Sequence, residues 1–249
     1  MNSDPIIEVA DLSKVFQIAR NKPVSIKERL LRSNKSSLSS FVALDRVSLR
    51  VRHGEAIGVV GHNGSGKSTL MKCISGIMYP TFGSVSVSGR VVPLLELGAG
   101  FQADLSAREN IYMNAAILGL SKSQTNAVFE SIVDFSGLQE FLEMPVRHYS
   151  SGMYARLGFS IAVHVRPEVM IFDEVLAVGD EVFQAKCLRR ISEMVSGGTT
   201  MILVTHSVAQ VRSVCSRGIV LSHGRLVFDG DPDDCADFYQ NMSTDPQVG

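Results

Sequence analysis

Residues 61–68 read Gly-His-Asn-Gly-Ser-Gly-Lys-Ser and directly follow the apolar segment Ala56–Val60. Two glycines, a lysine and a serine at these spacings, placed between a strand and a helix, are typical of a phosphate-binding loop. Glycines let backbone N–H groups curl around phosphate oxygens, and the N-terminus of the following helix adds partial positive charge. We therefore expect an α/β domain whose parallel sheet carries this loop.

The polar residues of the loop predict separate roles toward a nucleotide. Lys67 is expected to reach the β- and γ-phosphates, and the Ser68 hydroxyl is expected to lie on Mg²⁺. The predicted nucleotide-binding set of the loop is Gly61, His62, Asn63, Gly64, Ser65, Gly66, Lys67, Ser68 and Thr69.

A second candidate site follows the apolar run 169–172, which is typical of a buried parallel strand. Two acids, Asp173 and Glu174, end this run. Ligands bind at the carboxyl ends of parallel strands, so both acids are expected near the phosphate loop. Asp173 would hold Mg²⁺ through water, and Glu174 would orient and deprotonate the attacking water as a general base.

Strands alternate with helices along the chain, which favours an α/β fold. The predicted helix that begins at Lys122 has Ser121 as its N-cap. Predicted strands are 6–16, 42–51, 55–60, two within 83–95, 169–172, 200–204, 218–221 and 226–228, and predicted helices are 67–75, 107–141 with a break near 119–121, 152–165 and 181–195.

Composition excludes several classes of function. The formal net charge of −1 gives no basic surface for nucleic acid, and the four cysteines have no metal-ligand spacing, so they are interpreted as reduced thiols. No apolar run approaches the roughly 20 residues that cross a bilayer, and the N-terminus does not read as a signal peptide. We expect a cytosolic protein that acts at a membrane through an embedded partner.

Three further motifs narrow the class of nucleotide-binding protein. Tyr149-Ser150-Ser151-Gly152-Met153 precedes the acidic strand, Ala177-Val178-Gly179-Asp180 follows it, and His206 follows the apolar strand 201–205. In this order they resemble the signature motif, the D-loop and the switch histidine of ABC transporter nucleotide-binding subunits. The resemblance covers nearly the whole chain.

The resemblance implies an ATPase with Mg²⁺ that forms a homodimer around two ATP molecules and drives a separate membrane permease. It implies a fold with a mixed-sheet core, an antiparallel β subdomain and an inserted helical subdomain near 105–165. The catalytic residues would be Glu174, His206 and Lys67. Ser150, Ser151 and Gly152 would contact ATP on the partner subunit, and Asp180 would belong to the D-loop.

Some positions depart from the family pattern or stay open. Ser151 replaces a glycine of the usual signature and Met153 replaces a glutamine, although serine can still donate hydrogen bonds. Gln102 is the candidate for the family's metal-binding glutamine, beside Ser68 and Asp173, although it lies closer to Glu109 than is usual; the alternative is a surface glutamine. For the adenine-stacking aromatic, Phe16 is the candidate and Phe41 is a rival.

Residues 17–41 form a basic insert with six cationic residues and one acid. Ile26, Leu30 and Leu31 fall at helical spacing, which is typical of a short amphipathic helix; the alternative is a solvated basic loop. The insert, the segment 94–101, the segment 108–112 and the Ser-Ser-Gly-Met signature resemble the branch that exports lipid-linked polysaccharides. We expect a single domain, 1–249, without a C-terminal carbohydrate-binding domain, on the cytoplasmic face of the cell membrane.

The insert is expected to touch the permease or the pyrophosphate of a lipid-linked glycan, since cations near anionic head groups contribute roughly 1 kcal/mol each. Three alternatives remain. The chain could serve an ABC transporter of another cargo, such as a lipid or a drug. It could be a non-transport ABC ATPase, or a regulatory copy that does not hydrolyse ATP.

Overall fold

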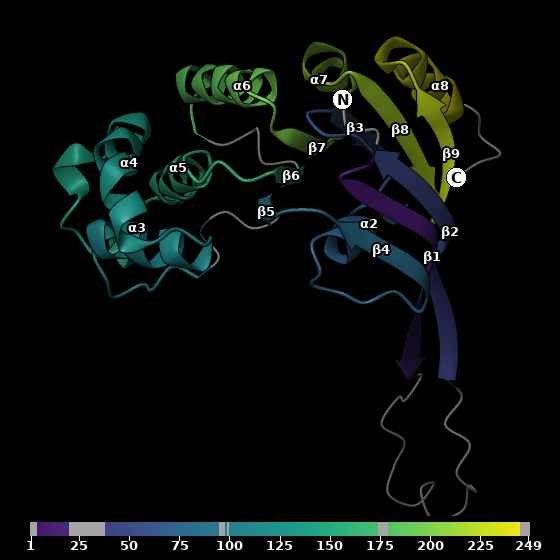
Figure 1. Ribbon diagram of the computed structural model, residues 1–249, viewed down its shortest axis with the longest axis horizontal. Helices are drawn as coiled ribbons and strands as arrows, with labels where there is room; N and C mark the ends of the chain where they lie inside the picture. The colour runs from purple at the N-terminus through teal and green to yellow at the C-terminus, as the bar shows by residue number, and fades with distance from the viewer. Residues whose placement is uncertain (1–3, 20–37, 95–97, 99, 174–178, 245–249) are drawn as a thin grey trace, which may run out of the picture.

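The structure is a computed structural model, and it describes residues 4–19, 38–94, 98, 100–173 and 179–244. In Figure 1 the sheets lie on one side of the molecule, and the helices within residues 107–162 lie on the other. The α/β class expected from the sequence is confirmed.

The smaller sheet is antiparallel and has the strand order β2-β1-β4. Its strands are β1 (Ile7–Ala19), β2 (Leu38–Val51) and β4 (Phe82–Val87). β1 and β2 form a long ribbon in which Phe16 pairs with Phe41 and Ala19 pairs with Leu38. This ribbon extends below the rest of the protein in Figure 1.

The larger sheet has the order β5-β6-β7-β3-β8-β9. Its strands are β3 (Ala56–Val60), β5 (Val91–Leu94), β6 (Val169–Asp173), β7 (Thr200–Val204), β8 (Arg217–Ser222) and β9 (Arg225–Gly230). All neighbours are parallel except β8 and β9, which form a hairpin. The central strands β3 and β7 are buried along their whole length, as expected of a parallel sheet covered on both faces.

Two hydrophobic clusters cover the two faces of this sheet. On β3, Ile57 and Val59 pack with α2 (Lys67–Ile74) and the small sheet, whereas Ala56 and Val60 point into the opposite cluster. That opposite cluster contains residues of α6 (Glu181–Ser196), α7 (Val208–Val214) and α8 (Pro232–Thr244). The alternation follows from the two-residue period of a strand.

Three helices, α3 (Ala107–Ile117), α4 (Lys122–Ser136) and α5 (Ser151–Ala162), form a separate cluster of their own. We call this group the helical subdomain. Two short 3₁₀ turns, Gln139–Phe141 and Val146–His148, connect α4 to α5. The subdomain lies within the predicted bounds, and Ser121 caps α4 as predicted, accepting a hydrogen bond from Gln124 N at 3.2 Å.

The predicted limits of the two strands beside the basic insert were wrong. The strand pattern does not break at Gln17, because β1 continues to Ala19 and β2 already begins at Leu38. Cross-strand pairing between the two strands holds these residues in the ribbon, and such pairing is not visible in local sequence patterns. The predicted amphipathic helix lies outside the described residues. Helices α7 and α8 were not predicted.

The capping box at the start of α4 gives a stability prediction. Ser121→Ala removes the acceptor for Gln124 N, and it should lower the free energy of unfolding by about 1 kcal/mol in urea denaturation. Ser123→Ala is the matched control on the same helix, where the side chain is exposed, and it should change stability by less than about 0.5 kcal/mol. Equal effects of the two variants would contradict the capping role.

Candidate functional site

The loop between β3 and α2 is shaped by close backbone contacts. Gly66 is the N-cap of α2 and has a φ of 106°, a left-handed conformation. A Cβ atom at this position would lie 2.7 Å from the carbonyl oxygen of Ala43 on β2. The strand β2 therefore packs directly against the loop, and only glycine fits between them.

Two polar side chains of the loop are buried. Lys67 is 7% exposed, and its Nζ donates hydrogen bonds to the carbonyl oxygens of Gly61 at 2.7 Å and His62 at 3.0 Å. The hydroxyl of Ser65 is fully buried and has no hydrogen-bond partner among the described residues. A buried polar atom without a partner is costly, so Ser65 is poised to bind an incoming oxygen. Lys67 holds the loop in its curled form.

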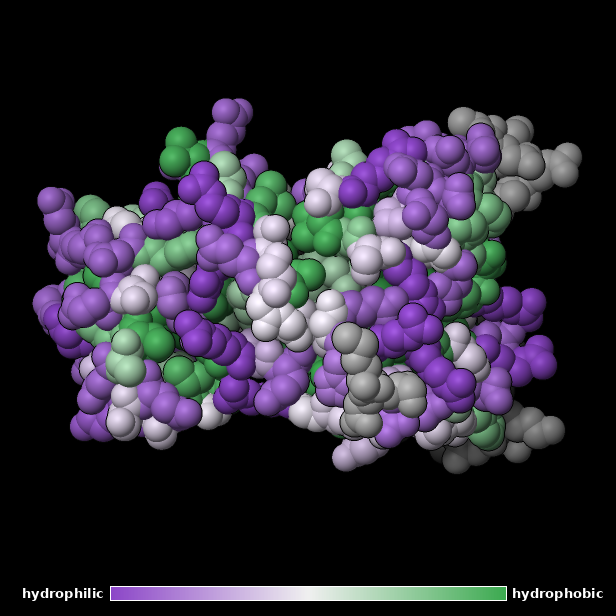
Figure 2. All heavy atoms as spheres, turned by 45° about the horizontal axis from the view of Figure 1, so that its top comes forward, coloured by the Kyte–Doolittle hydropathy of each residue, from purple (hydrophilic) through white to green (hydrophobic). Residues whose placement is uncertain are grey.

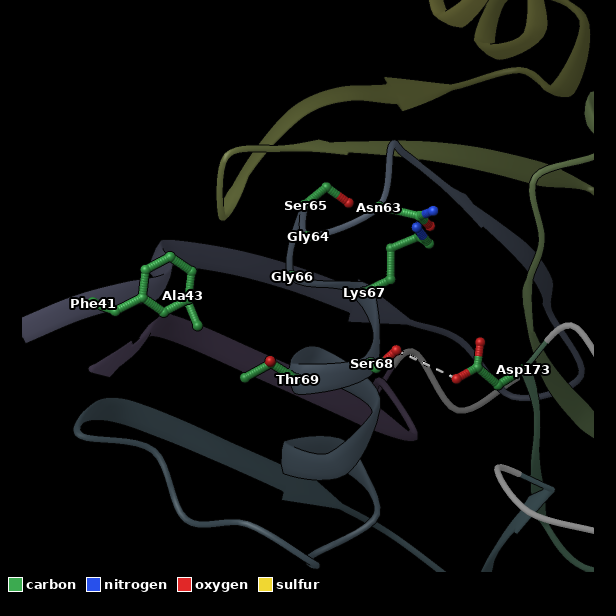
Figure 3. Close-up of a pocket in the computed structure, with 10 residues that line it drawn as sticks. All are labelled: Phe41, Ala43, Asn63, Gly64, Ser65, Gly66, Lys67, Ser68, Thr69 and Asp173. Carbon is green, nitrogen blue, oxygen red and sulfur yellow. Dashed lines mark hydrogen bonds between the residues drawn. The ribbon is translucent and has the colours of Figure 1, made fainter. Parts of the chain in front are cut away.

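A cavity of about 480 Å³ opens over this loop, as Figure 3 shows. Its size is in the range of small-molecule sites. The aromatic ring of Phe41, on β2, lies at one end of the cavity, and Asp173, at the end of β6, lies at the other. The lining residues are Phe41, Ala43, Asn63, Gly64, Ser65, Gly66, Lys67, Ser68, Thr69 and Asp173.

The structure brings Asp173 to the loop, as the sequence predicted. Parallel pairing sets Asp173 beside Val204 of β7, and β7 is the neighbour of β3. Ser68 Oγ donates a hydrogen bond to Asp173 Oδ2 at 3.4 Å. A hydroxyl and a carboxylate side by side are a donor set that fits a hard divalent cation such as Mg²⁺. Glu174 lies outside the described residues.

His206 follows β7 at the same carboxyl edge of the sheet. The strand end is fixed because Thr205 N donates to Val59 O at 3.2 Å, and Thr205 Oγ1 accepts a hydrogen bond from Ser207 N at 3.0 Å. His206 is exposed and is not among the cavity-lining residues. In strand order its position is between the acidic strand and the phosphate loop.

Gln102 is also exposed and does not line the cavity. Its backbone is held by the buried side chain of Asn110, which accepts from Gln102 N at 2.8 Å and donates to Gln102 O at 3.1 Å. The structure thus fixes the turn that carries Gln102, and its metal-binding role stays a prediction.

Phe16, the candidate for the adenine contact, does not line the cavity either. It is half-buried on β1, opposite Phe41, with Lys14 Nζ 5.5 Å from its ring centroid. Phe41, the rival, is 50% exposed and lines the cavity. The geometry favours Phe41 as the residue that stacks on a bound ring.

The signature residues begin α5, away from the loop. Ser150 is the N-cap, and its hydroxyl accepts from Met153 N at 3.2 Å. Tyr149 donates to Phe141 O at 2.8 Å, and burial raises the pKa of Tyr149 to about 12, so it stays a neutral donor. Ser150 and Ser151 are exposed, a Cβ at Gly152 would meet only Ser150 Oγ at 3.9 Å, and none of the three lines the cavity.

Asp180 is the N-cap of α6, and its carboxylate accepts a hydrogen bond from Phe183 N at 2.8 Å. Arg156, on α5, lies 3.9 Å from the other carboxylate oxygen of Asp180 and stacks over the ring of Phe183. The predicted D-loop aspartate is therefore tied to the signature helix of the same chain.

Two supports of the loop were not found from the sequence. Ala43 lines the cavity, and the β8–β9 turn holds the loop from behind, with Gly224 N donating to Ser65 O at 2.9 Å. The same turn accepts a hydrogen bond from Asp45 N, again at 2.9 Å. The hairpin itself was predicted, but no local signal indicates which segment it contacts.

Comparisons with known proteins show what this chain is similar to. The family model described as ABC transporter matches residues 44–177. The ABC transporter protein AbcA of Aeromonas salmonicida is 42% identical over 92% of this chain and 74% of its own length. The O-antigen export system ATP-binding protein RfbB of Klebsiella pneumoniae is 40% identical over 90% and 92%. The teichoic acids export ATP-binding protein TagH of Listeria innocua is 38% identical over 93% and 68%.

Solved structures share the fold. An ATP-binding subunit of an ABC transporter superposes with a TM-score of 0.76, at 24% identity, over 94% of this chain and 93% of that chain. A dimeric ATP-binding cassette in a post-hydrolysis state, bound to ADP and phosphate, has a TM-score of 0.73 at 18% identity, over 91% and 98%.

The two phenylalanines of the ribbon can be separated by mutation. Phe41→Ala should weaken ATP binding by roughly 1–3 kcal/mol, the usual loss when an aromatic side chain no longer stacks on a base. Phe16→Ala, the matched control on the opposite strand, should change affinity far less. Titration with a fluorescent ATP analogue measures both. If Phe16→Ala loses more affinity for the ATP analogue than Phe41→Ala, the adenine contact must be assigned to Phe16.

Proposed function

The chain belongs to the ABC transporter family, and from this membership we propose that it is the ATP-hydrolysing subunit of a polysaccharide exporter. It would work as a homodimer around two ATP molecules and drive a lipid-linked glycan through a separate membrane permease. The observation that carries the proposal is the cavity that joins Phe41, the phosphate loop and Asp173. Along the cavity, the aromatic ring would face the adenine base, the loop would face the triphosphate, and the acid would face the cation.

Binding of ATP rests on residues of this chain. The phosphates would lie at the N-terminus of α2, where no side chain caps the helix and where Gly66, Lys67 and Ser68 line the cavity. Lys67 would exchange its bonds to the Gly61 and His62 carbonyls for the β- and γ-phosphate oxygens. The buried Ser65 hydroxyl supplies one more donor.

Ser68 and Asp173 would hold Mg²⁺, with Gln102 as the third proposed contact. When bound, Mg²⁺ would supply positive charge that neutralises the negative charge developing on the phosphate oxygens. The adjacent hydroxyl and carboxylate, 3.4 Å apart, support this assignment.

Hydrolysis would use residues that follow two neighbouring strands. Glu174, next to Asp173 in the chain, would accept a proton from the attacking water. His206, next along the sheet edge, would contact the γ-phosphate. The parallel register of β6 and β7 supports this pairing, because it brings the ends of the two strands together.

The site is incomplete within one chain. Ser150, Ser151 and Gly152 are absent from the cavity lining, and Figure 1 shows α5 and α2 on opposite sides of β5. A second copy could present its signature residues to the γ-phosphate, with the N-terminus of its α5 directed at the negative charge. ATP would then hold two copies together, and hydrolysis would release them.

The cargo is inferred from the relatives, whose names include O-antigen and teichoic acid export. No described helix of this chain is long and apolar enough to cross a bilayer. Hydrophilic residues separate the hydrophobic patches on the face drawn in Figure 2. From the family and these relatives we place the protein on the cytoplasmic face of the cell membrane, bound to the permease.

The catalytic base can be tested directly. Glu174→Gln should keep ATP binding, lose hydrolysis by on the order of 10² to 10⁴, and trap an ATP-bound dimer. Steady-state ATPase assays and size-exclusion chromatography with ATP measure these outcomes. Glu130→Gln is the matched control, because Glu130 is an exposed acid on α4. Substantial turnover by Glu174→Gln would exclude Glu174 as the base.

The basic insert is a separate prediction. Residues 20–37 hold all six of its cations, and Ala19 pairs with Leu38, so an Asn-Gly turn can replace the segment without disturbing the ribbon. This variant should keep ATPase activity and lose export of the glycan. The matched control keeps the length and replaces the six cations with glutamine. Normal glycan export by both variants would show that the insert is not required for transport.

A further inference from the structure

Arg90 joins the helical subdomain to the sheet core. It lies between β4 and β5, and its backbone is fixed to the sheet, since Arg90 N donates to Glu168 Oε2 at 2.9 Å and Val169 N donates to Arg90 O at 3.1 Å. The first of these hydrogen bonds is the main reason that the pKa of Glu168 lies below its usual value. The backbone of Arg90, from which the side chain extends, is therefore anchored to the core.

The guanidinium of Arg90 contacts both the end of α3 and the segment that follows α5. Nη1 donates to Leu118 O at 3.4 Å and Gly119 O at 3.2 Å, just after α3. Nη2 donates to Val165 O at 3.2 Å and Arg166 O at 3.4 Å, just after α5. Carbonyls at helix C-termini have no partner within the helix and carry partial negative charge, so a cation is favourable there.

The remaining helix ends are capped from α6. Lys186 Nζ donates to Asp134 O at 3.3 Å and Phe135 O at 3.0 Å in the last turn of α4, and lies 4.5 Å from the Phe135 ring centroid. Arg190 Nη2 donates to Val163 O, the C-cap of α5, at 3.3 Å. All three helices of the subdomain thus have C-terminal carbonyls bound by a cation that belongs to the core.

We propose that Arg90, Lys186 and Arg190 are positioning residues that set the orientation of the helical subdomain on the core, and through it the position of the signature loop. The proposal rests on the proposed function, because the signature loop has a role only if Ser150 meets ATP on a second copy. Arg90 carries most of the effect, since it alone of the three residues binds both the end of α3 and the segment that leads from α5 back into β6.

The length of α5 explains why cations bound at its C-terminal end affect the position of Ser150 at its N-terminal end. The cations bind the C-terminal end of the helix, whereas Ser150 lies at its N-terminal end. Twelve residues at 1.5 Å each make a lever of about 18 Å, so a rotation of about 10° at the caps would move Ser150 by about 3 Å. A displacement of 1 Å can lower a rate by about 100-fold where reacting groups must be aligned.

A distance measurement on the nucleotide-free chain tests the positioning role. Spin labels go to Glu130→Cys on α4 and Gln240→Cys on α8, both exposed. The four native cysteines are buried and burial raises the pKa of each thiol, so they resist labelling. Arg90→Met should shift or broaden the distance distribution by about 3 Å, and Arg90→Lys should give a smaller change.

Kinetics supply the second readout. Arg90→Met should lower kcat for ATP hydrolysis by on the order of 10- to 100-fold. It should leave the affinity of the single chain for a fluorescent ATP analogue unchanged, because Arg90 does not line the cavity. Arg189→Met is the matched control, an exposed arginine on α6 beside Arg190, and it should change neither the label distance nor kcat.

Each outcome decides one question. An unchanged distance distribution in a folded Arg90→Met protein would overturn the positioning role. If Arg90→Met does not fold by circular dichroism, Lys186→Met replaces it, because Lys186 is exposed and its loss costs less structure. An inactive wild-type protein would count against the proposed function, while the label distances, measured without ATP, would still test the caps.

Discussion

The parallel register of β6, β7 and β3 is the constraint on which the site depends. Val204 of β7 pairs with Asp173 of β6 on one side and with Val59 of β3 on the other. Thr205 N, the next residue, donates a hydrogen bond to Val59 O. These hydrogen bonds bring the carboxyl ends of the three strands to one edge, so an acid, a histidine turn and a phosphate loop meet although they are far apart in the chain. A one-residue shift in register would move the side chains of β3 into the hydrophobic cluster on the opposite face, where the packing is different, so the edge is fixed.

The phosphate loop depends equally on segments that precede and follow it. Gly66 has room only for hydrogen against Ala43 O, and Gly224 N holds Ser65 O from the β8–β9 turn. Asp45 N closes the arrangement by donating to Gly224 O. Because Phe41 and Ala43 belong to the same strand as Asp45, the aromatic end and the phosphate end of the cavity share one scaffold. Their separation is set by backbone hydrogen bonds and does not rely on flexible side chains.

Local patterns in the sequence predicted the parts of the site that are local. The phosphate loop, the helix after it, the Ser121 cap and the acidic strand end are each encoded within about ten residues. The ribbon was mispredicted at Gln17, and the choice between Phe16 and Phe41 stayed open, because both depend on pairing between strands. Arg90 gave no signal either, since its carbonyl partners at Leu118 and Val165 lie 28 and 75 residues away. Contacts at such separation follow from the fold and leave no short motif.

Apolar packing and hydrogen bonds both join the helical subdomain to the core, and they contribute differently. Phe159 of α5 packs on Phe172 and Phe183, with ring centroids 6.3 and 6.2 Å apart, and burial of these rings supplies adhesion. Apolar contact is non-directional, so adhesion alone permits α5 to rotate on the core. Hydrogen bonds weaken steeply when the donor angle falls, so the guanidinium of Arg90, with both ends engaged, restricts that rotation. The directional contacts therefore define the orientation of α5, and with it the position of the loop at its far end, which apolar contact alone would leave open.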